Sequence, residues 1–228
     1  MISSDYSEQP VNAARTSWSV NRWVVARVFA ERYPRKTAGV VLVDAYSEDA
    51  QLSLNGKLTR LRLLAKDRKI PAPRSTLTAD DAMTTTEVKN AQDFIRDAIG
   101  TPKIEPPFDK LPPDAQRARL WAVVQPKSFA GGDDYLAEIS ATVYRESQRK
   151  AHPLGDTPLI VLARGKSDYP PDVAAVLTAE HNAQQAKFAT LSTRGTEIIV
   201  PNAGHHIQLD APDAVVDAIR RLVDRGRR

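Results

Sequence analysis

Three residues that could carry acid–base chemistry stand next to short apolar runs of the sequence. Asp44 ends the run AGVVLV, Asp168 follows the run PLIVLA, and His205 follows EIIV after a small-residue turn. If each run is a buried parallel strand, all three side chains lie at the carboxyl edge of one sheet, where open α/β sheets bind ligands. A carboxylate at that edge could bind the Nδ1 proton of an imidazole and keep Nε2 free to take a proton from a hydroxyl group.

The chain contains four histidines, which are His152, His181, His205 and His206. We expect His152 and His181, which lie in polar surroundings, to be surface or core residues. The adjacent pair at 205–206 does not indicate a metal site, because neighbouring side chains point apart on an extended chain. We therefore expect no metal and no other cofactor.

Helices and strands alternate in the segments that would position these residues. Because parallel strands need helical crossovers, this alternation predicts an α/β fold with a parallel sheet edge of about three strands flanked by helices. The apolar periodicity places the helices and strands as follows: helix 20–33, strand 38–43, strand 158–163, helix 172–194, strand 196–200 and a final helix after Pro212.

The segment between the first two strands differs in character. It is rich in charge, proline, leucine and alanine, and has little clustering of β-branched residues. We expect it to be entirely helical, with helices at 47–69, 79–99, 113–124 and 133–150 separated by proline-rich breaks. Such an insertion is either a cap over the carboxyl edge of the sheet or a second packed layer.

Two stretches resemble the α/β-hydrolase superfamily of esterase- and lipase-like serine hydrolases. RVFAERYPRKTAGVVLVDA is similar to the helix behind the nucleophile and the sixth strand, and NAGHHIQLD is similar to the histidine loop. The resemblance implies a partial α/β-hydrolase fold with a helical cap insertion. It divides the chain into a loose leader at 1–16, a core at 17–45 and 151–228, and a helical cap or lid at 46–150.

The resemblance also implies a Ser-His-Asp mechanism that hydrolyses an ester or related acyl bond of a small, largely apolar substrate. It assigns the base to His205 rather than His206, and it favours Asp168 as the orienting acid, with Asp44 as the alternative. Ser19, in SWSVN, stands where the family has the serine of Gly-x-Ser-x-Gly.

Both glycines of that motif are replaced, and only 16 polar residues precede the motif, where the family has about five strands. The pattern therefore lacks the N-terminal strands and the intact nucleophile elbow of the family. We expect the strand at 38–43 to leave an open edge that favours self-association. The alternative function is that of a truncated or non-catalytic homologue that binds a small molecule or a protein.

Composition excludes several other classes of protein. The net charge of +4 comes from mixed charges over 228 residues, which does not indicate nucleic-acid binding. The chain has no cysteine, no signal-peptide pattern and no apolar run approaching the ~18 residues of a membrane span. We therefore expect a cytoplasmic protein, and the resemblance implies that it acts on a small ester-like molecule.

Overall fold

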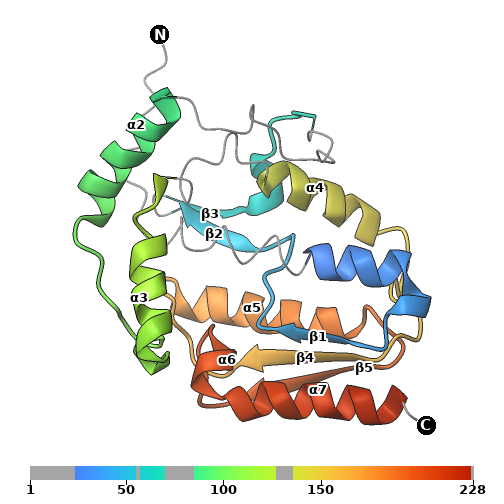
Figure 1. Ribbon diagram of the computed structural model, residues 1–228. Helices are drawn as coiled ribbons and strands as arrows, with labels where there is room; N and C mark the ends of the chain where they lie inside the picture. Colours follow the sequence, from blue (N-terminus) through green and yellow to red (C-terminus); the bar gives the residue numbers. More distant parts are fainter. Residues whose placement is uncertain (1–23, 55–56, 70–84, 127–135, 227–228) are drawn as a thin grey trace. The chain divides into compact units, whose positions relative to one another are not determined.

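The computed structural model describes residues 24–54, 57–69, 85–126 and 136–226 (Figure 1). The chain forms two compact units. The first, here called the helical unit, comprises Met1–Arg15 and Lys69–Asp134, and the second, the sheet unit, comprises Thr16–Arg68 and Tyr135–Arg228. Each unit is described by itself.

A three-stranded parallel sheet forms the centre of the sheet unit (Figure 1). Its strands are β1 (Val40–Val43), β4 (Leu159–Arg164) and β5 (Gly195–Val200), in the order β1-β4-β5. All six residues of β4 are buried, since β4 has a neighbour on each side and helices on both faces. The predicted strands and their parallel pairing are confirmed.

Helices cover both faces of this sheet. On one face Val161 and Leu42 pack with Phe188 of α5 (Ala174–Ala189), and on the other Leu162 packs with Leu222 of α7 (Pro212–Gly226). A further helix, described over residues 24–32, contributes Ala30 to the first of these clusters. The short elements η1 (Pro34–Lys36) and α6 (Ile207–Asp210) lead into β1 and α7.

The predicted helix at 47–69 is wrong. This segment forms an antiparallel pair, β2 (Gln51–Leu54) with β3 (Lys57–Arg60), followed by a 3-10 turn, η2 (Leu61–Leu64). The sequence QLSL-NG-KLTR explains the difference, because alternating polar and apolar residues on both sides of an Asn-Gly pair are typical of a β-hairpin. Helix α4 (Leu136–Ser147) packs against η2 through Leu136 and Leu61.

The described part of the helical unit consists of helices and turns, as expected. Helix α2 (Thr85–Phe94) continues into a π-helical turn, η4 (Ile95–Ile99), and α3 (Pro113–Ala122) follows the 3-10 turn η5 (Phe108–Lys110). Residues 46–68 and 135–150, which we assigned to the cap, belong to the sheet unit. Among all the described helices, none combines the length and the apolar character needed to cross a membrane.

Candidate active site

Asp44 occupies the end of β1 and is almost fully buried, with a relative exposure of 1%. Its backbone N–H donates to the Leu162 carbonyl of β4 at 2.7 Å, which extends the strand pairing by one residue. Its φ angle is +44°, in the left-handed region that residues other than glycine rarely adopt. The chain therefore turns sharply at Asp44, and the carboxylate lies at the carboxyl edge of the sheet.

His205 reaches this carboxylate from the loop after β5. Its Nδ1 lies 2.8 Å from Asp44 Oδ2, and its side chain keeps 18% exposure. The loop is held in place by backbone contacts, because the Ala203 carbonyl accepts from the N–H of Lys166 and the Gly204 N–H donates to Asp210. Within the described residues, the hydrogen bond of the His205 side chain is made by Nδ1, and none is made by Nε2.

A second imidazole binds the other oxygen of the same carboxylate. His181, in the middle of α5, lies with Nε2 2.9 Å from Asp44 Oδ1 and is buried. The backbone N–H of Arg164 donates to the same oxygen at 3.0 Å. Asp44 thus accepts hydrogen bonds from three residues that belong to α5, the end of β4 and the histidine loop.

Asp168, the favoured orienting acid, does not contact His205. Its side chain is 52% exposed and forms an ion pair with the Arg164 guanidinium. The Arg164 guanidinium also lies 4.6 Å from the centre of the Tyr169 ring. Arg164 therefore holds the side chain of Asp168 by an ion pair in the loop after β4. Asp44, the alternative acid, makes the contact with His205 that we expected of Asp168.

The surroundings of Asp44 keep its carboxylate ionised. Burial would raise the pKa of Asp44, but hydrogen bonds from His181 and His205 and the charge of Arg164 outweigh it and hold that pKa well below its usual range. Burial raises the pKa of Tyr46, whose ring lies edge-on to His205 at 5.1 Å between centres, so this phenol stays neutral. The site thus places one negative carboxylate behind His205.

This geometry is suited to proton transfer. Because an ionised carboxylate only accepts hydrogen bonds, the facing nitrogens carry the protons, which leaves His205 with a basic Nε2. In the described segments, no group of three or more His, Cys, Asp or Glu side chains could hold a metal ion. Ser19, the predicted nucleophile, lies outside the described residues.

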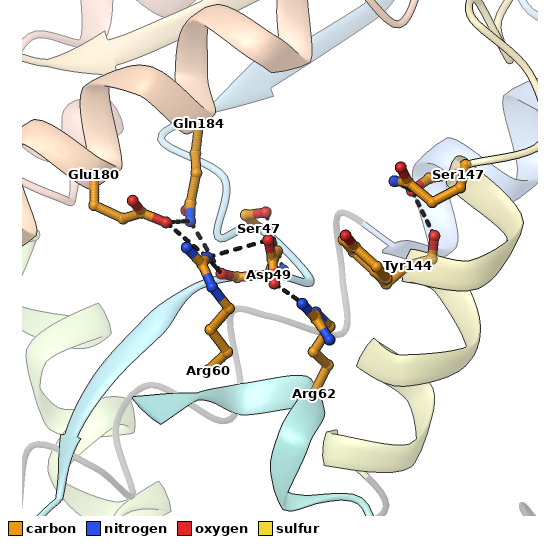
Figure 2. Close-up of polar contacts among 9 residues, drawn as sticks. Ser47, Asp49, Arg60, Arg62, Tyr144, Ser147, Glu180 and Gln184 are labelled. Atoms are coloured by element: carbon orange, nitrogen blue, oxygen red, sulfur yellow. Dashed lines mark hydrogen bonds and ion pairs between the residues drawn. The ribbon is translucent and has the colours of Figure 1, made fainter. Parts of the chain in front are cut away.

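A second polar cluster surrounds Asp49, five residues after Asp44 (Figure 2). Arg62 Nε lies 2.6 Å from Asp49 Oδ1, and Arg60 Nη1 lies 3.1 Å from Asp49 Oδ2 and 2.8 Å from Glu180 of α5. Gln184, one turn after Glu180, donates to the Asp49 carbonyl at 3.2 Å. This cluster ties the β2–β3 hairpin to α5.

His181 and Arg164 were missed as residues of the site. The signal for His181 is the spacing of Leu177, His181, Gln185 and Phe188, the buried residues of α5, which repeats every three to four residues and marks one helix face. A histidine on the buried face of a helix needs a polar partner. The polar residues next to His181 in the sequence do not show that it lies on such a face.

The comparisons with known proteins do not assign a family. No protein-family model matches the chain, and searches of curated proteins and of solved structures find no significant match. What is established is a small parallel three-stranded sheet flanked by helices, with a buried Asp–His pair at its carboxyl edge.

Proposed function

We propose that the chain is an α/β-hydrolase-like serine hydrolase that cleaves an ester or related acyl bond of a small, largely apolar substrate. The observation that carries this proposal is the 2.8 Å contact between His205 Nδ1 and Asp44 Oδ2 at the carboxyl edge of a parallel sheet. An imidazole that is oriented by a buried carboxylate and has a free second nitrogen supports general-base activation of a hydroxyl group.

In this mechanism Ser19 is the nucleophile. His205 Nε2 takes the hydroxyl proton as Ser19 Oγ attacks the acyl carbon, and the negative charge of Asp44 stabilises the resulting imidazolium. His205 then gives this proton to the departing alcohol, which leaves an acyl-enzyme. Water attacks the acyl-enzyme with His205 again as base, which releases the acid and restores Ser19.

A fluorophosphonate probe, which phosphonylates activated serines, tests the proposal on the full chain. We expect labelling at Ser19 that is lost in Ser19→Ala and His205→Gln. We expect the labelling rate of Asp44→Asn to fall about a thousandfold or more, because the wrong imidazole tautomer is then favoured. Asp168→Asn is the matched control, and its labelling rate should equal that of the wild type.

Three outcomes would contradict the proposal or one of its assignments. Absence of labelling in protein that melts cooperatively would exclude an activated serine and favour the binding-module alternative. Labelling that survives Ser19→Ala would show a different nucleophile. Equal loss of labelling in Asp44→Asn and Asp168→Asn would contradict the assignment of Asp44 as the orienting acid.

A further inference from the structure

We propose that His181 is a positioning residue of this site, which anchors Asp44 from α5 so that the second carboxylate oxygen faces His205. The inference rests on the proposed function, since it concerns the acid that orients the proposed base. It starts from the 2.9 Å contact between His181 Nε2 and Asp44 Oδ1, which no catalytic step uses.

The carboxylate is fixed through the oxygen that His205 does not use. Asp44 Oδ1 accepts from His181 at 2.9 Å and from the Arg164 backbone N–H at 3.0 Å, whereas Oδ2 lies 2.8 Å from His205 Nδ1. The two donors to Oδ1 come from different elements, α5 and β4. A rotation of the carboxyl group would break both of these hydrogen bonds inside a buried site, where water cannot take the place of the lost acceptor.

Helix α5 holds the backbone beside Asp44 as well. Gln185, one turn after His181, donates from Nε2 to the Ala45 carbonyl at 2.6 Å, and both side chains are buried. Residues four apart lie on the same face of a helix, so one turn of α5 binds two consecutive residues of the turn after β1. Phe188, on the same face, packs into the core and fixes this turn of the helix.

The arrangement sets opposite proton positions on the two imidazoles. Because the Asp44 carboxylate only accepts, His181 carries its proton on Nε2 and His205 carries its proton on Nδ1. The second of these is the form in which His205 can act as a base toward a hydroxyl group. If His181 positions Asp44, then removing the Nε2 donor of His181 allows His205 to adopt either neutral tautomer.

Two amide substitutions separate positioning from packing. In His181→Gln the amide nitrogen occupies the place of imidazole Nε2 and can still donate to Asp44, whereas in His181→Asn it occupies the place of Nδ1 and cannot reach. Imidazole ¹⁵N chemical shifts of the full chain report the tautomer of His205. We expect the Nδ1–H form in the wild type and in His181→Gln, and loss of that preference in His181→Asn.

The matched control is His152→Asn, the same change at an exposed histidine that contacts the Thr190 carbonyl, and it should leave His205 unchanged. An unchanged His205 tautomer in folded His181→Asn would overturn the inference. If His181→Asn does not fold, His181→Gln decides alone: the Nδ1–H form supports the inference, and its loss in folded protein overturns it.

The fluorophosphonate rate gives a second measurement that separates this inference from the proposed function. We expect the rate to fall by up to about a hundredfold in His181→Asn and to be restored largely in His181→Gln, as for a misplaced catalytic group. If the wild type is not labelled, the proposed function fails, while the tautomer of His205 still shows whether His181 positions Asp44.

Discussion

Asp44 and Asp49 are five residues apart, and both bind basic side chains, but their surroundings differ. Asp44 is 1% exposed and receives two imidazoles and a backbone N–H at the carboxyl edge of the sheet. The side chain of Asp49 is 21% exposed and pairs with Arg60 and Arg62 of the hairpin segment (Figure 2). Water can replace the partners of Asp49 but has little access to Asp44. Losing the partners of Asp44 should therefore cost more free energy of unfolding than losing those of Asp49.

The difference also separates the roles of the two clusters. Asp44 accepts hydrogen bonds from two imidazoles, and the Nε of Arg164 lies 3.8 Å from its Oδ2. Around Asp49 the partners are guanidiniums, which stay protonated and act as fixed charges. A buried carboxylate with imidazole partners is suited to chemistry, whereas a half-buried carboxylate with arginine partners is suited to holding a hairpin against a helix.

The strongest test of this comparison is the same substitution at both positions. We expect Asp44→Asn to lower the free energy of unfolding by about 3 kcal/mol, because the amide has no charge and keeps only one accepting oxygen for the donors of this buried network. We expect Asp49→Asn to lower it by about 1 kcal/mol or less, as for other ion pairs near the surface. Urea unfolding of the two variants measures both values, and equal losses would contradict the distinction.

A second test concerns the close backbone approach that the Asp44 cluster needs. A Cβ added at Gly165, directly after β4, would lie 2.5 Å from Pro201 Cα and 2.6 Å from the Pro201 carbonyl oxygen. We expect Gly165→Ala to push the histidine loop away and to lower stability by about 1–3 kcal/mol, the usual cost of overpacking.

The matched control for that test is Gly204→Ala, in the histidine loop itself. A Cβ at Gly204 meets its nearest atom, Asp210 Oδ2, at 3.4 Å, which is an ordinary contact. We expect this variant to unfold like the wild type in urea and to keep the Nδ1–H form of His205. Equal effects of the two alanines would show that the approach of Pro201 to Gly165 does not position His205.

A third test measures how the free energy of unfolding changes at acid pH. The pKa of Asp44 is lowered in the folded state, so its contribution to stability is present above the unfolded pKa of about 3.9 and is lost as pH falls toward the folded pKa. Below pH 4 this one group adds about 1.4 kcal/mol per pH unit to the slope of stability against pH. The pKa of Glu138, lowered to about 2 by Arg68 against the effect of burial, acts in the same direction.

We therefore expect Asp44→Asn to flatten the acid dependence of the unfolding free energy between about pH 4 and pH 2, relative to the wild type. Urea titrations at several pH values measure the slope. Glu138 remains in both proteins, so it cancels in the difference. A variant with the same slope as the wild type would show that Asp44 does not bind its proton more weakly in the folded state.

The sequence predicted the sheet well because buried parallel strands have a simple pattern. The runs that became β1, β4 and β5 are apolar and rich in β-branched residues, and they are separated by segments long enough for crossovers. The hairpin was missed because its strands alternate leucine with polar residues in a charged context, and we took that context as helical. The Asn-Gly pair at 55–56 was the better signal.

The candidate site was predicted in part. The end of a strand identifies Asp44 and His205, because an apolar run stops there and a polar residue follows. It cannot decide between Asp44 and Asp168, since that depends on how the loop after β4 folds and on Arg164, which draws Asp168 away. His181 comes from a crossover helix, and only the packing of α5 on the sheet brings it to Asp44.

The smallest expected effect is the coupling between Asp49 and Arg60. We expect a double-mutant cycle of Asp49→Asn and Arg60→Gln to give a coupling free energy of about 0.2–1 kcal/mol, because both side chains remain partly in water. This coupling should decrease when salt is raised from 0.1 M to 1 M, since the screening length then falls from about 10 Å to about 3 Å. The paired cycle of Asp44→Asn and His181→Asn should be less sensitive to salt, because buried groups are screened less. If both couplings fall equally with salt, burial does not explain the difference between the two aspartates.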